Sequence, residues 1–107
     1  MGRRSERAKT VVELTSSAKR DLKRLKKELT TSAEADLYEA FEIICSDPLS
    51  GKSLQGNFSE YYSFRFCGNY RIIYKIVKEP KETIIRIFGI GDRKDIYDKL
   101  SRFLSLL

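Results

Sequence analysis

Histidine is absent from this chain, and its absence limits the chemistry that the residues can perform. None of the 107 residues is histidine, and the two cysteines, Cys45 and Cys67, form no Cys-x-x-Cys pair. Histidine general bases, histidine metal ligands and the Ser-His-Asp and Cys-His systems are therefore excluded. Neither a disulfide framework nor a cysteine-rich zinc site is supported. An enzyme of this composition works with arginine, lysine, tyrosine and carboxylates, and we expect no metal and no small-molecule cofactor.

Two arginines are predicted to face each other across a β-hairpin. Residues 61–66 alternate between aromatic and polar side chains, which is typical of a strand with one buried face. A three-residue loop at 67–69 pairs Arg65 with Arg71 and keeps the aromatic face buried. A two-residue loop would place Arg71 among the aromatic rings, where an unpaired charge costs several kcal/mol. The longer loop is therefore favoured, and we expect Asn69 to adopt its left-handed position.

The facing arginines have two interpretations. Like charges directly opposite each other destabilise a sheet by up to about 1 kcal/mol, and a phosphate held by both guanidiniums would replace that repulsion with charge-assisted hydrogen bonds. Alternatively, Arg65 and Arg71 are solvated surface residues, paired with Glu60 or Glu82. The spacing leaves both interpretations open.

Further candidate residues lie on either side of this hairpin in the sequence. Arg93, Lys94 and Tyr97 follow the last predicted strand directly, so they can emerge at the end of the same sheet. A strand-to-helix turn also offers free backbone N–H groups to an anion. Tyr97 is a candidate base or stacking platform, with ordinary packing at a helix start as the alternative. The glycine-containing loop at 49–59 carries Lys52 towards the sheet.

The charge balance favours a polyanionic partner. The chain has a net charge of +6, with 34% charged and 41% hydrophobic residues, and a basic surface of this kind attracts nucleic acid. Two free cysteines fit a reducing cytoplasm. No run of about 18 apolar residues is present to span a bilayer, and the N-terminus lacks the apolar segment of a secretion signal. We expect a soluble, cytoplasmic protein with no membrane partner.

The apolar pattern predicts an α+β fold in the order βααβββα. A helical hairpin packs on a small, antiparallel-type sheet, within a single domain at 10–107 that follows a flexible basic arm at 1–9. The expected elements are a strand at 10–14, helices at 18–29 and 31–47, strands at 61–66, 70–77 and 83–88, and a closing helix. The expected helix caps are the hydroxyls of residues 15–17, a capping box of Thr31 and Glu34, and Asp92.

Several short motifs are spread over residues 10 to 100. The first half carries Leu14-Thr15, Asp47-Pro48 and Gly51-Lys52, and the second half carries Tyr70-Arg71-Ile72 and Ile90-Gly91-x-Arg93. Together these motifs resemble the RelE/ParE toxin superfamily, and the later segment is similar to the catalytic half of its RelE members. The resemblance implies a small sheet packed on helices, cleavage of messenger RNA in the ribosomal decoding site, and neutralisation by a cognate antitoxin.

The resemblance also implies roles for individual residues. Arg71 matches the strand arginine of the family's Tyr-Arg motif, Arg93 matches the arginine after the last strand, and Tyr97 matches the catalytic tyrosine. Arg65 and Ser63 stand where RelE members have lysines. Because arginine does not release its proton readily, Arg65 suits phosphate binding better than general base catalysis. Ser63 departs from the family pattern by removing a titratable cation.

The resulting hypothesis is a type II toxin that acts as a metal-independent endoribonuclease on the ribosome. The 2′-hydroxyl of the messenger RNA attacks the adjacent phosphate. The catalytic residues are Arg65, Arg71, Arg93 and Tyr97, and the further RNA-binding residues are Lys52, Ser63 and Lys94. The alternatives are a ParE-like toxin that binds gyrase and cleaves nothing, and a degenerate RNA-binding homologue without activity.

A cognate antitoxin is the second expected partner, after messenger RNA on the ribosome. Its peptide is expected to cover the Arg65–Arg71 face or to displace the closing helix. The apolar residues near the end of that helix are candidates for core packing or for an exposed patch. They are Leu100, Phe103, Leu104, Leu106 and Leu107.

Overall fold

The structure, a computed structural model, describes residues 9–106 but not the side chains of Asn57 and residues 103–106. The helices are α1 (Ser16–Glu28), α2 (Thr31–Ser46) and α3 (Arg93–Leu106), with the short 3-10 helices η2 (Pro48–Ser50) and η3 (Gly56–Phe58). The strands are β1 (Lys9–Leu14), β2 (Lys52–Ser53), β3 (Tyr61–Phe66), β4 (Tyr70–Lys78) and β5 (Glu82–Asp92). The arm expected at 1–9 lies outside the described residues except for Lys9, with which β1 begins.

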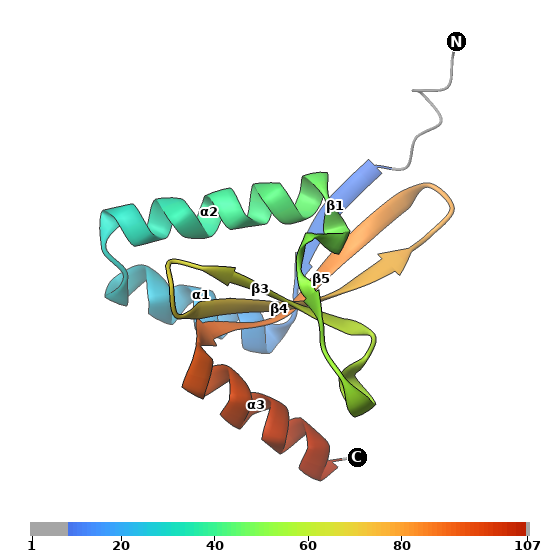
Figure 1. Cartoon of the computed structure of the whole chain (residues 1–107). Helices are drawn as coiled ribbons and strands as arrows, with labels where there is room; N and C mark the ends of the chain where they lie inside the picture. The colour runs from blue at the N-terminus through green and yellow to red at the C-terminus, as the bar shows by residue number, and fades with distance from the viewer. Residues whose placement is uncertain (1–8, 107) are drawn as a thin grey trace.

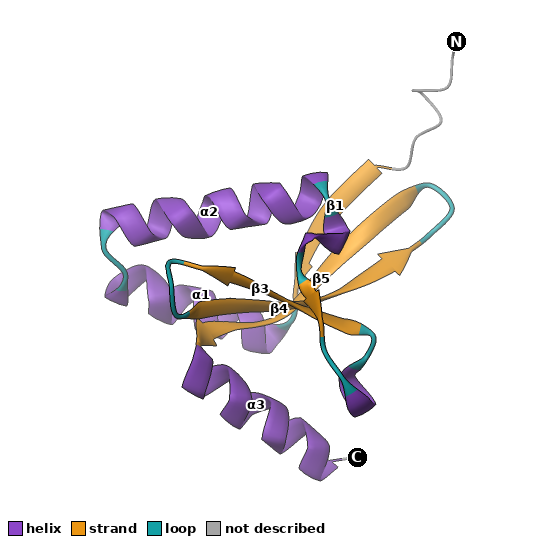
Figure 2. Cartoon of the chain, viewed as in Figure 1, coloured by secondary structure: helices purple, strands orange, loops and turns teal. Residues whose placement is uncertain are grey.

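The strands form a mixed sheet in the order β1-β5-β4-β3-β2. β1 pairs in parallel with β5, and the other neighbours are antiparallel. The α+β class and the order of the main elements are confirmed. Two features were not expected, namely the parallel pairing of β1 and the strand β2, which lies in a segment expected to be a loop. Figure 2 shows the β4–β5 hairpin and β1 extending away from the helices together.

The core lies between the α1–α2 hairpin and one face of the sheet. Figure 1 shows α2 and α3 on opposite sides of the central strands. Apolar side chains recur at helical spacing along α1 and α2 and alternate along the strands, so each element buries one face. The largest fully buried side chains are Leu25, Leu37, Ile44, Ile72, Tyr74, Ile85, Ile87 and Ile90. Cys45 is half-buried in α2, and burial raises the pKa of its thiol, which suits the expected packing role better than nucleophilic chemistry.

Each α-helix begins at a side-chain cap. Thr15 accepts a hydrogen bond from the Ala18 N–H at 3.1 Å, as expected for α1. Asp92 accepts from the Asp95 N–H at 2.9 Å, as expected for α3. The prediction for α2 was wrong by one residue, because Thr30 is its cap and Thr31 is already helical. Two adjacent threonines offer the same hydroxyl, and the sequence pattern does not separate them.

β5 continues to Asp92, beyond the expected strand end at Phe88, and leads directly into α3. Ile96 of α3 is 3% exposed. Its side chain lies against the backbone of β5, where a Cβ added to Gly89 would meet it at 3.4 Å. Small residues in this part of β5 therefore allow α3 to pack closely on the strand.

A buried tyrosine fixes the segment that contains β2. The Tyr74 hydroxyl donates to the Pro48 carbonyl at 2.7 Å and accepts from the Gly51 N–H at 3.0 Å. A Cβ at Gly51 would lie 2.6 Å from the tyrosine oxygen, so only glycine fits without a shift. Burial raises the pKa of Tyr74. This connection holds the chain just before Lys52.

Candidate active site on the open face of the sheet

The hairpin of β3 and β4 has the predicted register. Arg65 lies directly opposite Arg71, and the next pair along the two strands is Phe64 with Ile72. The three-residue loop at 67–69 is confirmed. The conformation expected for Asn69 was wrong, because Cys67 (φ 48°) and Gly68 (φ 78°) are the left-handed residues. The reason is local, since glycine adopts positive φ without steric cost.

The side chains on the open face line one groove of about 440 Å³. We call it the cationic groove, and its lining residues are Lys52, Ser53, Leu54, Gln55, Ser63, Arg65, Arg71, Arg93 and Tyr97. Among the described residues, the lining includes four cations and no carboxylate. The groove thus brings together all four residues expected to be catalytic, along with Lys52 and Ser63.

The cations of the groove have no carboxylate partner within the described part of the chain. Glu60, one of the two carboxylates considered as a partner, pairs with Lys75 at 3.0 Å. Glu82, the other, lies opposite Lys9 at the far end of β5. Within the described residues, Arg71 donates only to the neighbouring Tyr70 carbonyl, at 3.3 Å. A site of this charge favours a bound anion, because a phosphate would offset the mutual repulsion of the guanidiniums.

α3 contributes two side chains to the groove from consecutive turns. The Arg93 guanidinium carbon lies 5.4 Å from the centre of the Tyr97 ring, which is a cation–π contact. The Arg93 N–H donates to the Asn69 carbonyl at 3.0 Å, so the start of α3 is joined to the β3–β4 loop. Tyr97 is 52% exposed and is accessible to a ligand.

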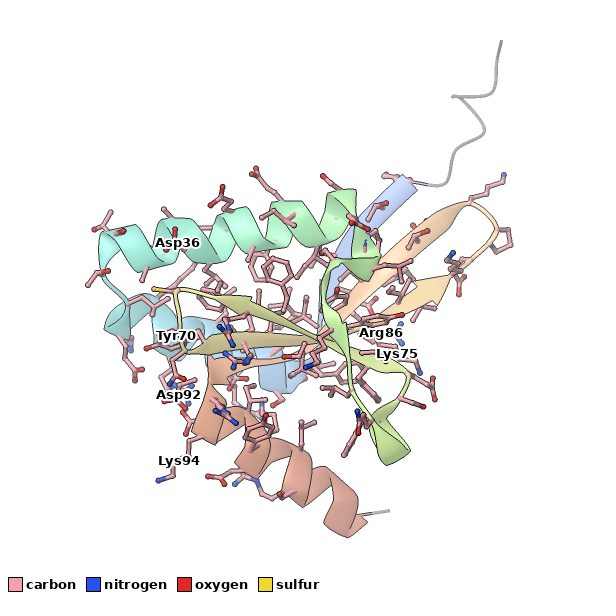
Figure 3. All side chains as sticks on the ribbon, viewed as in Figure 1. Asp36, Tyr70, Lys75, Arg86, Asp92 and Lys94 are labelled. Atoms are coloured by element: carbon pink, nitrogen blue, oxygen red, sulfur yellow. The ribbon has the colours of Figure 1, made fainter. Side chains whose placement is uncertain are left out.

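Lys94 is the one expected site residue that lies outside the groove. It lines an adjoining open hollow together with Asn69, Arg93, Tyr97 and Asp98. In Figure 3 its side chain points outward from α3. A helix places neighbouring residues on different sides, so Lys94 cannot share the direction of Arg93.

Three lining residues were missed by sequence reasoning. Ser53, Leu54 and Gln55 belong to β2 and the segment after it. β2 is two residues long and has no periodic pattern. It pairs Lys52 with Ser63 and Ser53 with Tyr62. Two short motifs of the resemblance, Gly51-Lys52 and Leu54-x-Gly56, fall in this segment, and we assigned a site role to Lys52 alone.

Two structural features bear on metal binding and membrane crossing. Among the described residues, no group of three or more His, Cys, Asp or Glu side chains is arranged to hold a metal ion. In the same part of the chain, every helix is too short or too polar to cross a membrane.

The fold and the groove define a small toxin of the RelE/ParE type, and the comparison of sequences identifies the family. Residues 12–97 match the family of ParE toxins of type II toxin–antitoxin systems. The chain belongs to this family, and it is a toxin of a type II system within the RelE/ParE superfamily. A search of curated protein sequences found no match.

Several solved structures with the same fold come from toxin–antitoxin complexes. The RelBE2 complex of Mycobacterium tuberculosis contains a chain that is 30% identical, with a TM-score of 0.60, over 78% of this chain and 96% of that one. The DinJ–YafQ complex of Escherichia coli contains a chain that is 16% identical, with a TM-score of 0.67, over 83% of this chain and 98% of that one. An E. coli RelE mutant bound to a RelBc antitoxin peptide is 16% identical, with a TM-score of 0.59, over 85% of this chain and 93% of that one.

Proposed function

We propose that this toxin is an endoribonuclease that cleaves messenger RNA on the ribosome. One observation carries the proposal: Arg65, Arg71, Arg93 and Tyr97 line one open groove, to which the described part of the chain contributes no carboxylate. A groove of this kind attracts a phosphodiester and offers several fixed donors to the charge that develops on its oxygens. The resemblance of the second half of the chain to RelE members supports the same activity.

The proposed reaction is an internal transfer at the phosphate. The 2′-hydroxyl oxygen bonds to phosphorus and the bond to the 5′-oxygen breaks, which leaves a cyclic phosphate and a free 5′-hydroxyl. Arg65, Arg71 and Arg93 hold the phosphate oxygens, because guanidiniums stay charged and bind phosphate in a bidentate manner. The phenolate oxygen of Tyr97 accepts the 2′-hydroxyl proton and becomes the neutral phenol. Lys52 supplies a proton to the leaving 5′-oxygen, because an ammonium group is a better proton donor than a guanidinium.

Mapping of messenger RNA ends after induction tests this function. We expect cuts within translated regions when the parent toxin is induced, and a loss of cleavage of about 10²–10³-fold for Arg71→Ala or Arg93→Ala. Lys81→Ala removes an exposed charge in the β4–β5 turn and serves as the control. Cuts that are equally frequent with Arg71→Ala and with the control would refute the assigned site.

The proposed partners are translating ribosomes and a cognate antitoxin, in the cytoplasm. The solved relatives are recorded with RelB-type or DinJ antitoxins. In this chain the antitoxin peptide covers the Arg65–Arg71 face or displaces α3. Co-purification with a toxin lacking residues 100–107 separates the two modes, because unchanged binding removes the end of α3 from the interface.

A second candidate function is inhibition of gyrase without RNA cleavage. The family match is to ParE toxins, which favours this class. Induction followed by parallel measurement of plasmid supercoiling and protein synthesis discriminates the two, since a gyrase inhibitor changes supercoiling first. A third candidate, an inactive RNA-binding homologue, is suggested by Ser63 at a family lysine position, and growth arrest on induction would exclude it.

A further inference from the structure

α3 carries two residues of the cationic groove, Arg93 and Tyr97, and their side chains make few contacts with the rest of the protein. Tyr97 is 52% exposed, and its ring is contacted by Arg93. Within the described residues, neither side chain makes a hydrogen bond or an ion pair. The position of both side chains therefore depends on how α3 itself is attached to the rest of the fold.

Besides the contacts of Ile96 and an exposed Arg24–Asp95 pair at 3.8 Å, α3 has a shielded polar attachment on the other side of the helix. Residues of an α-helix are rotated by about 100° each, so Lys99 is about 200° around the axis from Tyr97. The Lys99 ammonium nitrogen lies 2.5 Å from a carboxylate oxygen of Asp21 in α1. It also donates to the Ser17 hydroxyl at 2.6 Å. Lys99 and Asp21 are 18% and 13% exposed, so this ion pair is well shielded from water.

Asp21 also holds the strand that precedes α3. The same carboxylate oxygen accepts a hydrogen bond from the Ile90 N–H of β5 at 3.0 Å. β1 ends at Leu14, opposite Ile87, so beyond that point β5 has no strand on this side. The carboxylate takes the place of the missing strand. One side chain of α1 therefore contacts both β5 and α3.

Gly89 allows the lysine to reach across β5. A Cβ at this position would lie 3.1 Å from Lys99 Cδ and 3.2 Å from its nitrogen. The lysine chain therefore lies directly against the strand backbone. This close contact fixes the direction of Lys99 and, with it, the rotation of α3.

We infer that Asp21, Lys99 and Ser17 form a positioning centre that sets the rotation of α3 and so holds Arg93 and Tyr97 in the cationic groove. These three are positioning residues and touch no reacting atom. The kinetic consequence rests on the proposed function, whereas the attachment of α3 does not. Loss of one partner leaves a shielded charge unpaired, which is more disruptive than loss of an exposed pair.

Two substitutions test the centre, with a matched control. Asp21→Asn removes the charge and keeps an oxygen for the Ile90 N–H, and Lys99→Met keeps the apolar stem. We expect either change to lower the single-turnover rate of messenger RNA cleavage by about tenfold to hundredfold, because small misplacements of reacting groups are costly. The toxin concentration for half-maximal cleavage should change little. Glu13→Gln, which removes the pair with Arg86 on β1 and β5, should leave the rate unchanged.

A double-mutant cycle that combines Asp21→Asn with Tyr97→Phe distinguishes positioning from general loss of structure. If Asp21 acts through Tyr97, Asp21→Asn should lower the rate much less in the Tyr97→Phe background than in the parent. Hydrogen exchange supplies a readout that needs no activity. The backbone amides of α3 should exchange about tenfold faster in both variants than in Glu13→Gln, while those of β4 keep their protection.

The outcomes separate the inference from the proposed function. Faster exchange confined to α3, together with non-additive rates, supports the positioning centre. Exchange of α3 equal to that of Glu13→Gln, or rate losses that simply multiply with Tyr97→Phe, would overturn it. If the parent cleaves no RNA, the proposed function fails and hydrogen exchange alone decides the inference. Should Asp21→Asn not fold, Lys99→Met decides it, because the Asp21–Ile90 contact stays in place.

Discussion

Lys52 of β2 and Ser63 of β3 lie directly opposite each other, and both line the cationic groove. RelE members, which the second half of the chain resembles, have a lysine at the Ser63 position. In this toxin an amine therefore reaches the same region of the groove from the neighbouring strand. Because Lys52 is the only lysine among the described residues of the lining, we expect Lys52→Met to lower single-turnover cleavage by about 10²-fold or more.

The double variant Lys52→Met/Ser63→Lys tests whether cleavage requires an amine in the groove or requires that the amine come from β2. We expect it to recover much of the lost cleavage, since the new ammonium starts from the position directly opposite. Lys78→Met, an exposed lysine at the end of β4, is the control and should behave as the parent. No recovery in the double variant would show that Lys52 acts from β2 in a way that position 63 cannot replace.

Arg65→Ala is expected to weaken binding of RNA in a salt-dependent manner. Each phosphate contact that is lost lowers the slope of log affinity against log salt by about 0.7 for a single strand. Binding of a short, 2′-O-methylated RNA measured at several salt concentrations gives this slope. A parallel shift of the whole line without a change in slope would mean that Arg65 contacts no phosphate.

Tyr74→Phe is expected to destabilise the fold and to disturb β2. It removes the hydrogen bonds to Pro48 and Gly51, and the loss of a buried partner costs about 1–3 kcal/mol. Denaturant unfolding measures the change in the free energy of unfolding. Tyr61→Phe, on the more exposed side of the same sheet, is the matched control and should have a much smaller effect.

The raised pKa of Tyr74 makes the stability of the fold depend on pH. Burial raises the pKa of Tyr74 above its ordinary value of 10.0, so the unfolded chain loses this proton at lower pH than the folded one. The contribution of this pKa difference to the free energy of unfolding is complete below about pH 10, and it is lost as pH rises through the pKa of Tyr74 in the folded protein. The stability difference between the parent and Tyr74→Phe should therefore shrink above pH 10. A difference that grew with alkaline pH would contradict this.

The arginine pair was predictable from the sequence because it depends on local information. A strand alternates with period two, and the alternative register would have buried Arg71 among aromatic side chains. These constraints act within one hairpin, and the structure has the predicted pairing of Arg65 with Arg71. The contribution of α3 followed from chain order, because Arg93 comes directly after β5.

The parts that were not predicted depend on contacts between distant segments. The parallel pairing of β1 with β5 joins the two ends of the domain, and no local pattern specifies it. β2 forms because Tyr74 holds the preceding segment through Gly51, a contact across 23 positions of the chain. Gln55 enters the groove as a result. The centre at Asp21 and Lys99 also links residues far apart in sequence, so their spacing gave no sign of it.

The most direct test of the account is a structure of the toxin on a translating ribosome whose messenger RNA carries a 2′-O-methyl group at the cleavage site. The methyl group blocks the attack and retains the intact phosphodiester. We expect a single phosphodiester within hydrogen-bond distance of Arg65, Arg71 and Arg93, with Tyr97 beside the modified 2′-oxygen. A complex in which the messenger RNA lies outside the cationic groove, or in which these arginines contact separate groups, would contradict the central claim.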